Sequence, residues 1–459
     1  MKSSPLEALP IELVELIVTF LEPRDVASLR LTSRIVADKT SQGSFAARFT
    51  RRTVALTTAT LREMVRVTGQ GHLGRLLQHV TIAGIARDGT TAAEKEEEEE
   101  DTEHRRLLTE AFDTLKRRSP TGGLSSLRLR VAARVDGADG EELVEPDHFY
   151  AWRRVWDAAL RAFKVTMAAL SEARLPVTEQ LDLFGSVRGC SLACDAFLLA
   201  FAHGPASMMM RTIFGSVKRV MVSLSAPYQA ATEHGSESES RHANLILQNI
   251  LQVLLPVMPE LQSLDLHWYN LGASTSTSPV PSATRQDSNS NTSSAAAANL
   301  KECSLRGIYV SEDDLLRFLQ AVRPATVTLT DIRLVAGTYA SIFHYLTDPD
   351  GPVTRYHLDD IRERNALVHF DVPGRPKFRY CRDDAVGPSS LTRRASQEVK
   401  EEEGIRYRFA RGRALGAGER RRWLQSKARE FGPPRSGVYD FIQMNSQQVA
   451  AASEGSDDE

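Results

Sequence analysis

The chain has 459 residues, which at ~150 residues per domain allows about two to four domains or one long array of repeats. Hydrophobic residues make up 42% of it and charged residues 25%, so most of the chain can bury a core. The 57 Lys and Arg residues nearly balance the 59 Asp and Glu residues, which excludes a protein that binds nucleic acid through overall basic charge. Four cysteines cannot form a disulfide framework in so long a chain and indicate reduced thiols in an intracellular protein, cytoplasmic or nuclear.

No segment is typical of export or of a membrane span. The first apolar stretch, residues 13–21, contains Glu15 and follows Pro5 and Pro10. A signal peptide has a basic start and an uninterrupted apolar centre, so this stretch is not one. The most apolar later stretch, residues 245–258, is interrupted by polar residues and is too short to cross a bilayer. We therefore expect no membrane partner.

Residues 1–52 are expected to form a small helical domain. Pro10 suits the first turn of a helix, because that position has no intrahelical N–H bond to lose. Apolar residues then recur at helical spacing, Pro23 and Asp25 start a second helix, and residues 33–36 continue into a third. A unit of this size buries little and usually needs a partner. The apolar stripe is therefore either the domain's own core or a surface that another chain covers.

This segment resembles an F-box. The resemblance is carried by Leu9-Pro10, Glu12, Leu13, Ile17, Phe20-Leu21, Asp25-Val26, Leu29 and Arg30-Leu31-Thr32-Ser33-Arg34. The motif covers about a tenth of the chain, its organisation is similar to that of fungal F-box proteins, and Ile35-Val36 replaces an aromatic residue often found there. F-box proteins dock this module onto a Skp-type adaptor and through it onto a cullin in the SCF ubiquitin ligase. The resemblance implies adaptor contacts at Leu9, Pro10, Leu13, Ile17, Leu21, Val26 and Leu29.

A short phrase with apolar residues at its first, fourth and sixth positions recurs through residues 53–372. Copies begin at residues 77, 124, 178, 217, 261, 300, 324 and 353. The phrase is typical of a short strand, and several copies follow an amphipathic helix. This alternation resembles leucine-rich repeats, which stack because one repeat cannot bury its own apolar side. We therefore predict an α/β fold, a three-helix F-box followed by an irregular leucine-rich-repeat-like solenoid. An ordinary α/β domain is the alternative.

Low-complexity segments mark the expected loops and the expected C-terminal extension. The acidic run within residues 86–104 and the Ser/Thr-rich run 272–299 bury too little apolar area to become ordered, so we predict disordered loops there. Residues 373–459 are charged and turn-rich. They are predicted to contain a helix at about 419–431 that caps the repeats, followed by a disordered acidic end.

Polar residues between and just after the apolar positions of each phrase are expected on the face that binds a target protein. Charged and aromatic side chains dominate this set, as is common at protein interfaces. For any single residue, a solvated surface position is the alternative. The candidate target contacts are Asp265, His267, Trp268, Arg306 and Asp331.

Motifs for catalysis, cofactors and metals are absent from the sequence. It contains no GxSxG elbow, P-loop or HExxH motif, so the chain is expected to be non-catalytic and to need no cofactor. Cys190 and Cys194, with His203 downstream, lack a clear fourth ligand and the spacing of a zinc site. We expect these cysteines to be small buried hydrophobes.

The function expected from these features is that of a substrate-recognition subunit of an SCF-type ubiquitin ligase, with an unknown protein as target. The basic segment 405–435, which interleaves arginines with aromatic residues, leaves a nucleic-acid-binding scaffold as an alternative. The nearby acidic run 398–403 partly neutralises that segment, so nucleic acid is not the preferred partner. A third possibility is an F-box scaffold that binds the adaptor without directing ubiquitin transfer.

Overall fold

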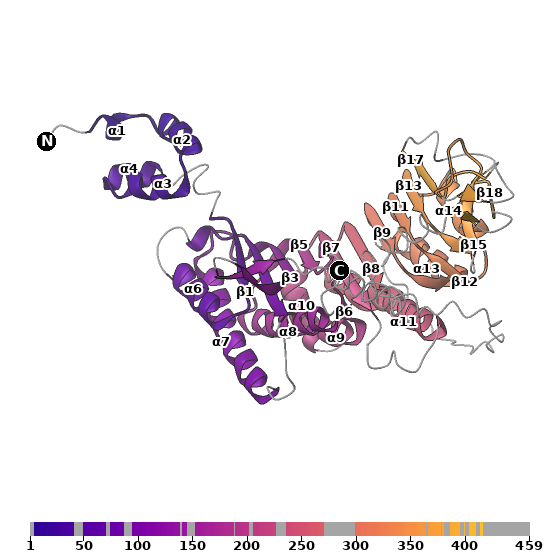
Figure 1. Cartoon of the computed structure of the whole chain (residues 1–459), viewed down its shortest axis with the longest axis horizontal. Coiled ribbons are helices and arrows are strands. Elements are labelled where there is room, and N and C mark those ends of the chain that lie inside the picture. The colour runs from indigo at the N-terminus through magenta and orange to yellow at the C-terminus, as the bar shows by residue number, and fades with distance from the viewer. Residues whose placement is uncertain are drawn as a thin grey trace, which may run out of the picture.

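The computed structural model is a mixed α/β fold with one large, mainly parallel sheet (Figure 1), as the sequence predicts at this level. A group of N-terminal helices lies apart from this sheet (Figure 1). Within the described residues, no helix is both long enough and apolar enough to cross a membrane. The structure describes residues 4–40, 49–69, 74–86, 94–137, 140–144, 152–187, 189–201, 205–225, 236–269, 299–363, 366–377, 379–380, 386–394, 399, 404–409 and 414–415.

Four short helices form the N-terminal group. Pro23 lies in the first turn of its helix, and the Ser33 hydroxyl accepts a hydrogen bond from a backbone N–H of the last helix. The Lys39 ammonium donates to the carbonyl oxygens of Glu7 at 2.7 Å and Leu9 at 2.5 Å, which ties the first helix to the last. The helices are α1 (Pro5–Ala8), α2 (Ile11–Phe20), α3 (Pro23–Arg30) and α4 (Arg34–Lys39).

The main sheet takes its strands in chain order. Neighbouring strands along its path are parallel as far as β13, and the last strand, β17, is antiparallel. Two further strands, β4 (Gly140–Val144) and β6 (Leu192–Ala193), pair with β3 and β7. The path is β1 (Arg51–Ala55), β2 (His79–Ala86), β3 (Leu124–Gly137), β5 (Val177–Leu183), β7 (Arg219–Ser225), β8 (Ser263–Tyr269), β9 (Glu302–Arg306), β11 (Thr326–Thr330), β13 (Arg355–Asp359) and β17 (Ser390–Arg393).

Helices connect the parallel strands and pack along the sheet (Figure 1). Between α11 and α12 the helix widens into a π-helical segment, Ile250–Leu254. Pro256 follows this segment, and a proline displaces the carbonyl four residues earlier, which accounts for the widening. The connecting helices are α6 (Thr58–Gly69), η1 (Gly74–Leu76), α7 (Glu94–Arg118), α8 (Trp152–Ala173), α9 (Cys194–Ala200), α10 (Pro205–Phe214), α11 (Ser236–Asn249), α12 (Leu255–Val257), α13 (Glu312–Val322) and α14 (Ala340–Thr347).

One line of aliphatic side chains crosses the main sheet and forms the centre of its core. Strand register places these residues opposite one another on successive strands, and each is at most 1% exposed. Because side chains alternate between the two faces of a strand, the residues on either side of them face the opposite, polar side. The line consists of Ile82, Leu129, Leu183, Val222, Leu266, Leu305, Leu329 and Leu358.

A smaller sheet follows the later strands. Its strands come mostly from the segments directly after β9, β11 and β13. It contains β10 (Tyr309–Ser311), β12 (Arg333–Ala336), β14 (Arg362–Glu363), β15 (Ala366–Phe370) and β18 (Tyr407–Phe409), and a separate pair joins β16 (Arg379–Tyr380) to β19 (Ala414–Leu415).

The same turn links the two sheets three times. Gly307, Asp331 and Asp360 each follow a main-sheet strand and have positive φ angles of 72°, 52° and 51°. The backbone N–H of Gly307 donates to Thr330 at 2.9 Å, and that of Asp331 donates to Asp359 at 2.8 Å. The residue after each turn is a buried isoleucine. Left-handed backbone is therefore part of the repeating unit, which glycine and aspartate accept more readily than β-branched residues.

We expect Asp331→Val to lower the free energy of unfolding by about 1–3 kcal/mol relative to Asp331→Gly, because valine resists a positive φ. Both variants remove the carboxylate that lies near Arg362, so the loss of that charge cancels in their difference. Urea unfolding of the two variants measures it. Equal stability would contradict a required left-handed turn.

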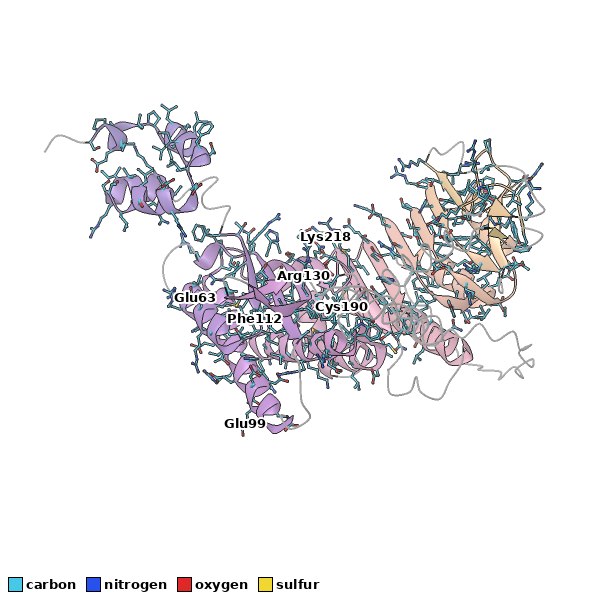
Figure 2. All side chains as sticks on the ribbon, in the orientation of Figure 1. Glu63, Glu99, Phe112, Arg130, Cys190 and Lys218 are labelled. Carbon is cyan, nitrogen blue, oxygen red and sulfur yellow. The ribbon has the colours of Figure 1, made fainter. Side chains whose placement is uncertain are left out.

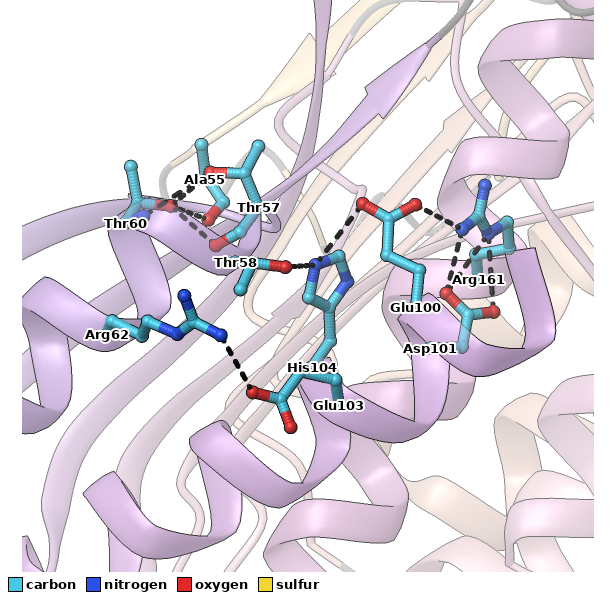
Figure 3. Close-up of polar contacts among 10 residues, drawn as sticks. All are labelled: Ala55, Thr57, Thr58, Thr60, Arg62, Glu100, Asp101, Glu103, His104 and Arg161. Carbon is cyan, nitrogen blue, oxygen red and sulfur yellow. Dashed lines mark hydrogen bonds and ion pairs between the residues drawn. The ribbon is translucent and has the colours of Figure 1, made fainter. Parts of the chain in front are cut away.

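The acidic run predicted to lie in a disordered loop at residues 86–104 is instead largely helical, because α7 begins at Glu94. Its acidic residues find basic partners on neighbouring helices (Figure 3): Arg161 pairs with Asp101 at 2.8 Å, and Arg62 with Glu103 at 3.5 Å. Glu99 lies at the far end of α7, away from the sheet (Figure 2). Composition alone therefore misjudged this run, since α7 packs against α6 and α8.

A histidine lies buried within this network (Figure 3). The His104 side chain is 1% exposed, and its Nε2 lies 3.4 Å from Glu100 Oε1 and 3.3 Å from Thr58 Oγ1. These contacts join α7 to α6 beneath the acidic residues. The helix is thus held both by apolar residues such as Phe112, which is fully buried, and by a polar contact at its amino-terminal half.

A carboxylate joins α13 to α14. Glu312 Oε2 accepts a hydrogen bond from the backbone N–H of Thr338 at 2.7 Å, and Glu312 Oε1 accepts one from the Ser341 hydroxyl. Gly337, with φ of 84°, lies where a Cβ would meet the Glu312 side chain. The bonds from Ser341 and Thr338 hold the pKa of Glu312 below its ordinary value.

We therefore expect Glu312→Gln to be less stable than wild type at pH 7 and equal to it in acid. A folded-state pKa below the unfolded one gives stability that is present above the unfolded pKa, near 4.5. That stability is lost as the pH falls through the lowered folded pKa. Urea unfolding of both proteins at pH 7, 5 and 3.5 tests this. If the difference in free energy of unfolding between wild type and Glu312→Gln stays constant across these pH values, ionisation of Glu312 plays no part in stability.

Three expectations lie outside the described residues. They are the loop at 272–299 apart from its last residue, the capping helix at about 419–431, and the acidic C-terminal end. Most of the basic segment 405–435 is also outside them. The expected boundary at residue 52 falls inside β1, since Arg51 and Arg52 already belong to that strand.

Candidate functional site

An apolar stripe on α2 is exposed along the side that faces away from the domain's own core. Leu13, Leu16 and Phe20 are 47%, 54% and 81% exposed, and their spacing puts them on one face of the helix. Val14 and Val18, on the other side, are buried. We call Leu13, Leu16 and Phe20 the α2 stripe. An aromatic ring and two leucines in water are unfavourable in a small domain, which makes the stripe a candidate surface for binding apolar groups.

Further large apolar side chains are exposed near the stripe in sequence. Leu31, after α3, is 88% exposed, and Ile35 in α4 is 49% exposed. Of the eleven large hydrophobic residues exposed in the described part of the chain, six lie in residues 4–40. Among the described residues, exposed apolar surface is therefore concentrated in the N-terminal domain rather than scattered singly.

The N-terminal domain has a small core of its own. Val18 and Val26 form it, and Leu21 and Phe49 pack against it, as a cluster separate from the large core of the sheet. One side of α2 is thus covered by its own domain, and the other side is exposed. A core this small contributes little stability unaided.

The seven expected adaptor contacts fall into three groups. Pro10 and Leu13 are exposed, whereas Val26 has no exposed surface and belongs to the domain core, so its assignment as a contact was wrong. Leu16 and Phe20 were not among the expected contacts, although the same helical periodicity identifies them. The remaining contacts, Leu9, Ile17, Leu21 and Leu29, are half-buried.

The second candidate surface is the polar side of the main sheet, opposite the line of aliphatic residues. We call it the polar sheet face. The arginines on it are Arg51, Arg128, Arg130, Arg219, Arg306 and Arg355, the carboxylates are Asp182, Asp265, Glu302 and Asp359, and the histidines are His79, His267 and His357. Among these residues, arginines outnumber carboxylates, so the described part of the face has an excess of positive charge.

Two ion pairs on this face join neighbouring strands. Arg306 Nη2 lies 2.7 Å from Asp265 Oδ2, and Arg128 Nε lies 3.1 Å from Asp182 Oδ2. Burial raises the pKa of Asp265 above its ordinary value, and the charge of Arg306 opposes this. Burial likewise raises the pKa of Asp182, opposed by a hydrogen bond from Ser186 and by Arg128. In both pairs the carboxylate lies deeper than the guanidinium, so the arginine is the group presented to solvent.

The structure brings three of the five expected target contacts together. Asp265, His267 and Arg306 lie on the polar sheet face in adjacent strands, although His267 is 8% exposed and its ring lies 4.3 Å from that of Tyr269. Asp331 lies in the turn after β11, beyond the strand. Trp268 has no exposed surface and points to the core side, so it cannot contact a target in this conformation.

The described cysteines are buried thiols. Cys190, Cys194 and Cys303 are at most 2% exposed and form no disulfide. Burial raises the pKa of Cys303 to about 12 and that of Cys190 further, so both remain protonated at neutral pH. Within the described ranges, no group of three or more histidine, cysteine or acidic residues is placed to hold a metal ion. His203, the other residue considered for zinc, lies outside them.

Comparison with known proteins identifies no family for this chain. A scan against protein-family models finds none that matches the chain, and a search of curated proteins finds no relative.

Proposed function

We propose that this protein is a non-catalytic substrate-recognition subunit of an SCF-type cullin–RING ubiquitin ligase. The observation that carries the proposal is the α2 stripe, where Leu13, Leu16 and Phe20 are exposed on a helix within the F-box-like segment. Apolar surface of this extent in so small a domain favours a permanent partner chain. A Skp-type adaptor is that partner in the proposal, and the cullin joins through it.

The body of the chain is proposed to be a leucine-rich-repeat-like array that holds a target protein. Three observations support this proposal. The strands neighbour one another in chain order, a continuous aliphatic line crosses them, and a left-handed turn recurs after β9, β11 and β13. The polar sheet face is the proposed target surface. Holding a target there would act by proximity, since the ubiquitin-transfer chemistry belongs to other subunits.

Co-expression of the full chain with a Skp-type adaptor, followed by purification through a tag on the adaptor, tests the proposal. We expect the two proteins to co-purify in equal amounts and a cullin–RING subunit to join them. Proteins captured by this complex should then be ubiquitinated in vitro in the presence of E1 and E2. Failure to capture the adaptor would remove the ligase assignment, whereas capture without ubiquitination would favour an F-box scaffold.

A further inference from the structure

Two arginines on the polar sheet face are held in place by carboxylates beneath them. Asp182, the partner of Arg128, is fully buried, and the side chain of Asp265, the partner of Arg306, is 20% exposed. The side chains of Arg128 and Arg306 remain 42% and 39% exposed. A guanidinium carries five N–H donors, and each ion pair occupies one edge of it. The other donors of both arginines are therefore available to a ligand.

Tethering makes these arginines better anion receptors than free surface arginines. A mobile arginine must lose rotamer freedom when it binds, whereas Arg128 and Arg306 are already fixed by contacts at 3.1 Å and 2.7 Å. A planar guanidinium matches a carboxylate or a phosphate with two parallel hydrogen bonds. The two sites thus favour anionic groups of that shape.

The rest of the face strengthens the same preference. Arg219 and Arg355 lie at the amino-terminal ends of β7 and β13, are exposed, and form no ion pair with another described residue. An anionic ligand therefore meets positive charge along the strand ends as well as at the two tethered arginines.

The spacing of the tethered arginines sets the length of the ligand. Arg128 lies on β3 and Arg306 on β9, with β5, β7 and β8 between them. Four steps of ~4.8 Å between strands, combined with an offset of two residues along β9, give a separation of ~20 Å. An extended peptide covers ~3.3 Å per residue, so its two anionic groups must be about six residues apart.

We propose that the target segment bound by the polar sheet face is an acidic peptide lying across the strands. It places one carboxylate or phosphate group on Arg128 and a second, about six residues away, on Arg306. This rests on the proposed function and names the chemistry of its target. A nucleic acid fits less well, because its continuous line of phosphates would also meet the carboxylate of Glu302 on the same face, whereas the peptide is anionic at two places only.

Fluorescence anisotropy with the full chain, at low salt and without adaptor, tests the proposal. The probes are a labelled Gly/Ser peptide with two Glu pairs six residues apart, the same peptide with phosphothreonine at those places, the same composition with adjacent pairs, and a single-stranded oligonucleotide. We expect the spaced peptides to bind at least tenfold more tightly than the adjacent-pair peptide. Comparing the affinities of the glutamate peptide and the phosphothreonine peptide then identifies the preferred anion. No binding of either spaced peptide, or tighter binding of the oligonucleotide, would overturn the proposal.

Variants locate the binding to the face. Arg306→Gln should weaken binding of the spaced peptide by roughly tenfold, as expected when one charge-assisted contact is lost. That change leaves Asp265 buried without its partner, so Arg219→Glu and Arg355→Glu provide a second test at positions with no such partner. Each should weaken binding without changing urea unfolding. Arg62→Gln, on α6 and 67% exposed, is the control. Wild-type binding by Arg306→Gln, Arg219→Glu and Arg355→Glu would refute the assignment.

The anisotropy assay and the adaptor-capture experiment can fail independently of each other. No adaptor is present in the anisotropy assay, so a chain that captures the adaptor but ignores acidic peptides refutes this inference alone. A chain that binds acidic peptides but not the adaptor leaves the polar sheet face intact as a site and removes the ligase assignment.

Discussion

Phe20→Asp should weaken capture of a Skp-type adaptor at least ~30-fold, because a buried aromatic contact at an interface centre is commonly worth 2 kcal/mol or more. Phe20 is 81% exposed in the chain alone, so the substitution costs the domain little packing. A charge at that position would have to be desolvated against the partner. Titration of purified adaptor into wild type and variant, followed by calorimetry, measures the loss.

Leu199→Asp is the matched control for this change. Leu199 is 75% exposed on α9, in the body of the protein rather than in the N-terminal domain. The control should bind the adaptor as wild type does. If Phe20→Asp binds as tightly as Leu199→Asp, the α2 stripe is not the adaptor surface.

Leu266→Ala should lower the free energy of unfolding by about 2–5 kcal/mol, the range found when a fully buried leucine is truncated. Leu266 has no exposed surface and stands in the middle of the aliphatic line, between Val222 and Leu305 on the adjoining strands. The cavity left there has tightly packed neighbours on both sides and cannot readily collapse. Urea unfolding followed by circular dichroism gives the value.

A surface leucine again supplies the comparison. Leu199→Ala removes the same atoms from a side chain that is 75% exposed and should change stability by less than about 0.5 kcal/mol. A comparably small effect of Leu266→Ala would mean that the aliphatic line is not the centre of the core.

The strands of the main sheet could be predicted from the sequence because a strand's apolar alternation is local. All eight recurring phrases contain a strand in the structure, from β2 to β13. The antiparallel strand β17 and the smaller sheet could not be predicted in this way. Their pairing depends on contacts between distant segments, such as that of Phe370 with Tyr407, and no short pattern encodes these.

The acidic run and Trp268 show two different reasons for error. Acidic residues of α7 pair with Arg62 and Arg161, which lie far from them in sequence, so composition could not reveal this pairing. The position of Trp268 was predictable, since it shares the parity of Leu264 and Leu266 along β8 and so faces the core with them. Trp268 was predicted as a target contact because it is aromatic, although the alternation along β8 places it on the core side.

The two candidate surfaces differ in how much of each could be predicted from the sequence. Helical spacing alone identifies Leu13, Leu16 and Phe20 as one stripe, but which side of α2 its own domain covers depends on the packing of Val18 against Val26. The register of β8 and β9 follows the recurring phrase, since Leu266 and Leu305 take the same position in their phrases and lie opposite one another. The ion pair of Arg306 with Asp265 joins residues two places apart in this register, and the phrase alone does not select that partner.

Hydrogen exchange with and without a Skp-type adaptor tests the central claim, that another chain covers the α2 stripe. A domain with so small a core opens readily when it is alone, so its amides should exchange quickly. We predict that adding the adaptor strongly protects the amides of residues 11–35 from exchange and changes the exchange of β7 and β8 little. Unchanged exchange at residues 11–35, or protection confined to the sheet, would contradict it.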